Sequence, residues 1–240
     1  MAVADIVSEE EVLSELGFSD PTEDQLTSIR RLKLAAEKAA RRFTGATLTQ
    51  ATYTHYLPRT EGVAANVLRL PEWPVRSITS IYLDHTGYFG QAPNAFAAST
   101  LLTAGQDYYL NIDRGGMSFF GYVTRIGAMM QGRTTLWPRT PGSVKITYVA
   151  GFSSSELSGE ATVDELNPQD IREAVLKIIG ARWHALENQQ NALVPGDVQS
   201  ESLEGWSQTK VVQPTDKEIP DYLPDDAKAL LKPYKRPVWM

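Results

Sequence analysis

Residues 20–45 carry the pattern that decides the fold, and they read DPTEDQLTSIRRLKLAAEKAARRFTG. Asp20, Pro21 and Thr22 are residue types that begin helices, and apolar side chains then recur at steps of three and four residues, the period of an amphipathic helix. Gly45 comes directly after the last turn, where a glycine commonly ends a helix. The stretch therefore predicts a helix over residues 21–44 whose apolar face must pack against other elements.

Three further helices are expected on either side of this one. Residues 8–16 begin with a capping box made by Ser8 and Glu11. Residues 168–188 begin at Pro168 and carry an apolar stripe with helical spacing. A short helix over residues 224–232 is ended by Pro233.

A β-rich segment over residues 47–150 separates the early helices from the later ones. Runs rich in β-branched and aromatic residues, bounded by proline and glycine turns, predict strands at 48–56, 66–70, 77–83, 108–112 and 144–149. The glycine pair in residues 111–116 predicts a hairpin turn. Residues 91–105 and 115–132 lack a clear period, so we expect a loop or flap and a flexible excursion there. A short strand or hairpin is expected within 201–212.

This order of elements predicts an α+β fold that is mainly α: a small helical bundle with an inserted β-rich segment and an extended C-terminal tail. We expect a single domain over residues 1–190 and, over 191–240, a linker, the short helix and the tail. The 240 residues are 42% hydrophobic and 22% charged, which is typical of a globular chain. No apolar run is long enough to span a membrane, and the first residues do not resemble a signal peptide.

Few residues of the chain point to chemistry. The absence of cysteine excludes disulfides, thiolate metal sites and a cysteine nucleophile. His55, His85 and His184 lie far apart in the sequence without metal-ligand spacing, and no phosphate-binding loop or serine nucleophile motif occurs. We therefore expect no catalytic residue, no metal and no cofactor. A hydrolase that uses paired carboxylates remains the weakest alternative, because such a pair leaves no sequence motif.

Charge is distributed unevenly around a net value of −6. Residues 1–24 contain eight acidic residues and no basic one, residues 30–42 contain six basic residues and one acidic one, and residues 227–240 contain four basic residues and no acidic one. This separation suits head-to-tail contacts between copies, although charge alone favours ordinary solvated faces. A net acidic chain is a poor candidate for gripping nucleic acid.

Two groups of residues are candidates for protein contacts. Aromatic and arginine side chains often anchor interfaces, and the C-terminus combines both, although the segment could equally pack on its own domain. Its candidates for binding a partner are Lys232, Tyr234, Lys235, Arg236, Val238 and Trp239. The candidates for a subunit interface are Arg30, Arg31, Arg41, Arg42, Phe119 and Phe120.

Several segments in order resemble the head–tail connector, or adaptor, proteins of tailed bacteriophages. These are the helix ending AARRFTG at residues 39–45, the segment LPEWPVRSITSIY at 70–82, and the segment QDYYLN at 106–111 with its glycine turn. The strand VKITYVAGF at 144–152, followed by the proline-led helix start NPQDIREAV at 167–175, is the most specific of them. The segment ALLKPYKR at 229–236 is similar to the family's closing segment. The long stretches near 91–105, 115–132 and 189–222 depart from the family pattern.

The resemblance implies a structural virion protein that is made in the bacterial cytoplasm and ends in the neck of the particle. Relatives form a ring, typically a dodecamer, that docks under the portal protein through a C-terminal segment and links it to the stopper or tail-terminator protein. Genomic DNA passes through such a ring, during ejection too, without specific binding, and no membrane is involved. The alternative is a tail-completion protein, a tail-terminator or another neck protein. Removing residues 232–240 is expected to leave a folded chain that no longer joins portal-bearing heads.

Overall fold

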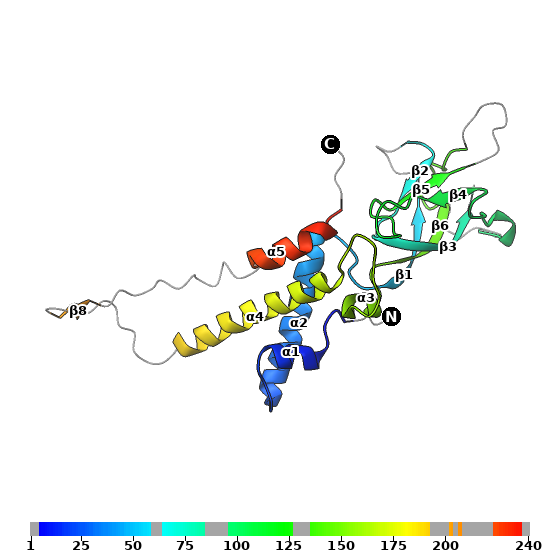
Figure 1. Cartoon of the computed structure of the whole chain (residues 1–240). Helices are drawn as coiled ribbons and strands as arrows, with labels where there is room; N and C mark the ends of the chain where they lie inside the picture. Colours follow the sequence, from blue (N-terminus) through cyan, green and yellow to red (C-terminus); the bar gives the residue numbers. More distant parts are fainter. Residues whose placement is uncertain are drawn as a thin grey trace.

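The computed structural model describes residues 5–58, 64–84, 96–126, 135–192, 202–203, 206–207 and 223–236. Its described part is a mixed α+β fold with five α-helices and two three-stranded antiparallel sheets (Figure 1). An α+β fold was expected, but the expectation that it is mainly α is not confirmed. Within the described residues, no helix is long and apolar enough to cross a membrane.

The predicted helices are present with small changes at their ends. Helix α1 spans Glu9–Glu15 and helix α2 spans Glu23–Thr44, and capping boxes at Ser8 and Thr22 begin them. Helix α4 spans Gln169–Ala192 and helix α5 spans Asp225–Leu231. Gly45 ends α2 with a φ of 69°. Helix α3, Ser154–Ser158, was not predicted, because its five residues are too few to show a helical period.

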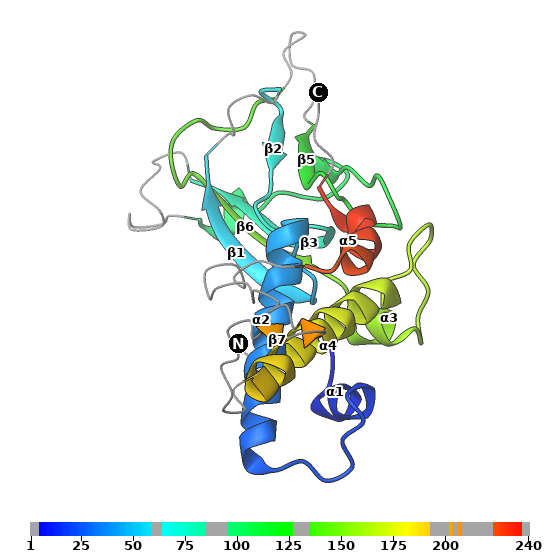
Figure 2. The same cartoon turned by 90° about the vertical axis from the view of Figure 1, so that its left-hand side faces the viewer.

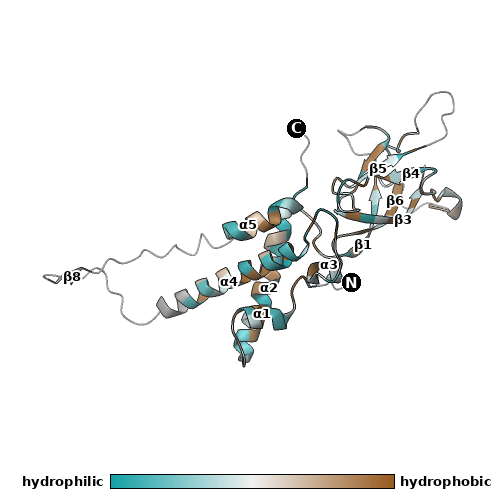
Figure 3. Cartoon of the chain, viewed as in Figure 1, coloured by the Kyte–Doolittle hydropathy of each residue, from teal (hydrophilic) through white to brown (hydrophobic). Residues whose placement is uncertain are grey.

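The helices pack around one hydrophobic core. Helix α4 crosses α2 and lies beside α5, and α1 packs near the first half of α2 (Figures 1 and 2). The stripe predicted on α4 is its buried face, because Ile171, Val175 and Ile178 are fully buried. Beyond Trp183 the described side chains of α4 are exposed, so its second half extends past the bundle (Figure 1). Apolar residues of α2 and α4 share this core, and brown segments alternate with teal ones along α2 (Figure 3).

The first sheet has the strand order β1–β6–β3. Strand β1 spans Ala51–Leu57, β6 spans Val144–Ala150 and β3 spans Val75–Leu83. Central strand β6 alternates strictly between buried and partly buried residues, as expected for a strand with one face on a core. All five strands predicted in the β-rich segment are present, with ends shifted by a few residues.

The second sheet has the order β2–β5–β4 and corrects one expectation. Strand β2 spans Val67–Arg69, β5 spans Tyr122–Arg125 and β4 spans Tyr108–Leu110. Strand β5 is central, yet it lies inside the stretch 115–132 that was expected to be a flexible excursion. Four residues beside several glycines are too short a run to show strand alternation. Residues 127–132 of that stretch lie outside the described residues.

The remaining short segments agree with the predictions in part. Gly115 and Gly116 have φ values of 55° and 70° and form the predicted tight turn, closed by a bridge between Arg114 and Met117. The described part of the expected loop 91–105 contains a 3₁₀ turn at Ala98–Thr100. Strands β7, Ser202–Leu203, and β8, Trp206–Ser207, form the short hairpin expected within 201–212. A 3₁₀ turn, Lys232–Tyr234, follows α5 at the start of the expected extended tail.

Candidate interaction surfaces

The segment after α5 is fixed onto the body of the chain by Tyr234. Its side chain is 1% exposed, its ring meets that of Phe152 edge-on at 5.6 Å, and its hydroxyl donates to the carbonyl oxygen of Asn167 at 2.5 Å. Burial raises the pKa of this hydroxyl, so it stays protonated and remains a donor. Tyr234, expected to bind a partner, is therefore a core residue of its own chain. The sequence left two alternatives for the C-terminal segment, binding a partner or packing on its own domain. Around Tyr234 the segment packs on its own domain.

Arg236 continues this attachment toward the second sheet. Its guanidinium donates from Nη2 to the carbonyl oxygens of Leu70 and Phe120, both at 2.9 Å, and lies over the ring of Trp73 at 5.4 Å. Burial lowers the pKa of Arg236 to about 10, so it remains charged at neutral pH. Because Leu70 belongs to the sheet core and Trp73 to the helical core, this one side chain connects both parts of the fold.

The other expected partner-binding residues remain at the surface or lie outside the described residues. Lys232 and Lys235 are exposed, and the Lys235 ammonium lies 3.8 Å from the centre of the Phe43 ring. Val238 and Trp239 lie outside the described residues. Of the described members of this group, the two lysines are thus available to a second protein, whereas Tyr234 and Arg236 are used within the chain.

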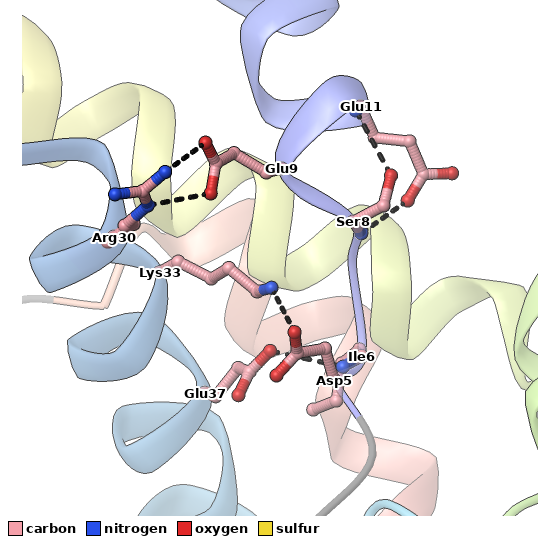
Figure 4. Close-up of polar contacts among 8 residues, drawn as sticks. All are labelled: Asp5, Ile6, Ser8, Glu9, Glu11, Arg30, Lys33 and Glu37. Carbon is pink, nitrogen blue, oxygen red and sulfur yellow. Dashed lines mark hydrogen bonds and ion pairs between the residues drawn. The ribbon is translucent and has the colours of Figure 1, made fainter. Parts of the chain in front are cut away.

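The N-terminal acidic segment lies along α2 and neutralises part of its basic side (Figure 4). Both carboxylate oxygens of Glu9 accept from Arg30, at 2.9 and 3.0 Å, and these bonds lower the pKa of Glu9. Asp5 accepts from Lys33 at 2.5 Å. Glu37 of α2 accepts from the backbone N–H of Ile6 at 3.0 Å. Arg30, expected at a subunit interface, is therefore occupied by its own chain.

The remaining interface candidates differ in what they contact. Arg41 makes an ion pair of 3.1 Å with Glu72 while half of its side chain stays exposed. Arg31 and Arg42 are exposed. Phe119 is 1% exposed in the helical core, so it is not a surface residue, and Phe120 stacks on Tyr122 at 5.6 Å. The exposed cations of α2 are thus the interface candidates that the structure leaves accessible.

Comparison with known proteins gives a likeness of fold. No family model matches the chain, and no curated protein matches it by sequence. A solved chain described as "Virion of native gene transfer agent (GTA) particle" matches with a TM-score of 0.52 and 16% identity, over 100% of this chain and 98% of that one. A chain from "Neck of empty GTA particle computed with C6 symmetry" matches with a TM-score of 0.51 and 14% identity over the same shares. This chain shares the fold of these GTA chains.

The described residues contain no cluster that indicates a metal site. No group of three or more histidine, aspartate or glutamate residues in that part of the chain could hold a metal ion. Glu156 is a buried carboxylate; burial acts to raise its pKa, but hydrogen bonds from Ser153 and Arg76 outweigh this and keep the pKa low. Arg76 also donates to the carbonyl oxygen of Gly151 at 2.9 Å. These contacts cap α3 and fasten it to β3, so they have a structural explanation.

Sequence reasoning missed residues that join distant segments of the chain. Glu72 is an example: it accepts from Arg41 and Thr47, and its backbone N–H donates to the Tyr148 hydroxyl at 3.0 Å. Its contacts join α2 and the segment directly after it to β6, which lies much later in the sequence. No local pattern marks such a residue. The one weak signal is that Glu72 lies in the segment at 70–82 that resembles the connector family.

Proposed function

We propose that this chain is a structural protein of the neck of a tailed, phage-like particle, where it forms the adaptor ring between the portal protein and the stopper or tail-terminator protein. The observation that carries the proposal is the likeness to GTA virion and neck chains, which extends over 100% of this chain and 98% of each of the two chains compared. The order of segments that resembles phage connectors is an independent support. The proposal includes no catalytic role.

A ring with a DNA path through its centre suits the charge of the chain. The net charge of −6 disfavours adhesion of phosphates, so DNA can pass without being held. A separation of acidic and basic surfaces on one subunit favours contacts between unlike faces of neighbouring copies, which is how cyclic rings close. The chain would be made in the bacterial cytoplasm and incorporated at the head–tail junction.

The first test is the mass of the assembled species. We expect the purified chain to form a ring, alone or when mixed with the portal ring encoded by the same genome, and native mass spectrometry would give its mass as a multiple of 26.6 kDa. Twelve copies would support the adaptor. A different copy number would favour the alternative, a tail-terminator, a tail-completion protein or another neck protein. A chain that stays monomeric and ignores the portal would contradict the proposal.

The second test concerns docking on the portal by the C-terminal end. Because Tyr234 and Arg236 are part of the fold, removing residues 232–240 would disturb the body as well as the tail. We expect instead that removing residues 237–240 leaves the unfolding midpoint within about 2 °C of the full chain, a change below about 0.5 kcal/mol. The same truncation is expected to weaken capture by portal-bearing heads about tenfold or more, measured by co-sedimentation.

A companion variant to this truncation is the double substitution Lys232→Ala and Lys235→Ala, which keeps the chain length and removes the two exposed cations that are candidates for the same docking. A loss in both variants would indicate that the cations and the terminal residues act together. Unchanged capture by both variants would exclude this end of the chain as the portal-docking segment.

A further inference from the structure

One exposed face of α2 combines cations with an apolar residue. Arg31, Leu34, Lys38 and Arg41 are spaced by three, four and three residues, so they lie on one side of the helix. All four are exposed, and Leu34 is 54% exposed. We call these four residues the α2 stripe. A large apolar side chain between cations is more typical of an interface than of a solvated helix face.

A shallow pocket lies beside the α2 stripe and gives it an apolar floor. The pocket has a volume of about 180 Å³. Its lining includes the buried Ile6 and Leu48 together with residues of α2: Leu34, Glu37, Lys38 and Arg41. Such an apolar centre with a charged rim can exclude water from a contact, which strengthens the ion pairs at its edge.

Two of the three cations of the stripe differ from their neighbours on α2 in making no ion pair within the described residues, whereas Arg41 pairs with Glu72. Arg30 and Lys33 are paired with Glu9 and Asp5 of the N-terminal segment (Figure 4). In the described part of the chain, Arg31 and Lys38 make no ion pair. The stripe therefore keeps a positive charge that the described part of the chain does not neutralise.

An acidic surface of matching character lies at the other end of the same helix. It consists of exposed acidic residues on α1, in the turn after it and in the first turn of α2: Glu10, Glu15, Asp20, Glu23 and Asp24. We call this surface the acidic tip. Both cartoon views place α1 and the start of α2 together at the end of the molecule that lies away from the sheets (Figures 1 and 2). At about 1.5 Å per residue, Asp24 lies about 10 Å along α2 from Arg31 and about 25 Å from Arg41, so within one chain the tip reaches no further than the start of the stripe.

We infer that the α2 stripe of one copy binds the acidic tip of a second copy. The two surfaces are unlike and lie at different places on the subunit, so the contact is heterologous and leaves a free tip and a free stripe for further copies. Leu34 and the pocket provide the apolar centre, and Arg31 and Lys38 provide charges opposite to those of the tip. The inference rests on the proposed function, because it describes how the neck ring would close.

Charge reversal and its rescue test this contact in the full chain. The stripe variant carries Arg31→Glu and Lys38→Glu, and the tip variant carries Glu15→Lys and Asp20→Lys, both outside the first turns of α1 and α2. We expect each variant to weaken ring assembly about tenfold or more, and the chain with all four substitutions to regain most of it. Sedimentation velocity at about 0.05 M and about 0.5 M salt measures this, and high salt should weaken wild-type assembly.

The matched control is Arg69→Glu with Arg139→Glu, two exposed arginines outside the stripe that give the same change in net charge. It should assemble like the wild type. Leu34→Ser tests the apolar centre without changing charge and should also weaken assembly. Circular dichroism checks that each variant is folded, and if the stripe variant fails to fold, Leu34→Ser and the tip variant decide the question.

The outcomes separate this inference from the proposed function. If the wild type forms rings and the stripe, tip and Leu34→Ser variants form them equally well, the inference is overturned while the neck function stands. If the wild type forms no ring, alone or with the portal, both are overturned. If the stripe variant assembles normally but loses binding to duplex DNA in a mobility-shift assay, the stripe is a DNA surface and the inference is wrong.

Discussion

Replacing Tyr234 by alanine is expected to lower the free energy of unfolding by about 3–5 kcal/mol, the usual effect of removing a fully buried aromatic ring. The ring is 1% exposed and packs edge-on against Phe152 at 5.6 Å. Its loss would also leave the carbonyl oxygen of Asn167 without its hydrogen bond from the Tyr234 hydroxyl. Urea unfolding followed by circular dichroism would measure the change.

The matched control is Tyr234→Phe, which keeps the ring and removes only the hydroxyl. We expect it to cost about 1 kcal/mol, the typical net contribution of one hydrogen bond. If Tyr234→Ala were as stable as the wild type, the segment after α5 would not be part of the fold. Tyr234 would then be free to serve as a partner anchor, so the same measurement decides between the two explanations of the C-terminal segment.

Local signals in the sequence were sufficient for the main helices. The side chain of Thr22 caps the start of α2, and the left-handed backbone of Gly45 ends the helix. Both effects act within one helical turn. The apolar stripe that includes Ile171 and Ile178 likewise predicts the buried face of α4. These features depend on residues close in the sequence, so the pattern is readable without knowing the fold.

The second sheet shows where local signals fail. Strand β5 pairs with β2 through Leu68 and Val123 and with β4 through Leu110 and Val123. These strands are three or four residues long, so the pairing, rather than any alternation in β5 itself, makes it a strand. Local signals also failed for Phe119. It lies in a glycine-rich stretch and was expected at a subunit interface, but its ring packs in the helical core against Trp73 and Phe152.

The sequence identified which segments form the candidate surfaces, but not which of their residues are accessible to a partner. The basic run of α2 was recognised as a possible subunit face, yet Arg30 is neutralised by Glu9, which lies 21 residues away in the sequence. Leu34 was not recognised, because one apolar residue on the polar side of a helix carries no signal until its exposure is known. Which cations of α2 are paired is a property of the folded chain, and the α2 stripe is selected by Arg31 and Lys38, which make no ion pair within the described residues.

Replacing Gly151 by alanine is expected to destabilise the chain by more than about 4 kcal/mol, a loss typical of backbone conflicts in a core. Gly151 has a φ of 95°, where side chains with a Cβ are strained. An added Cβ would lie 2.3 Å from the carbonyl oxygen of Thr49, an atom of the backbone that cannot rotate away. Thr49 forms a bridge with Phe152, so relief of the conflict would break the contact between the segment before β1 and the end of β6.

Gly116→Ala is the matched control for this substitution, because Gly116 has a φ of 70° but an added Cβ there would meet no atom within 4 Å. It should cost only about 1–2 kcal/mol, the penalty of the left-handed conformation itself. Thermal unfolding of both variants would separate this penalty from the close approach of the two backbone segments. Equal losses would contradict the packing at Gly151. A larger loss at Gly151 would explain why the segment VKITYVAGF needs a glycine before its final aromatic: β6 ends there in direct contact with the chain that enters β1, and this contact joins the sheet to the helical core through Phe152.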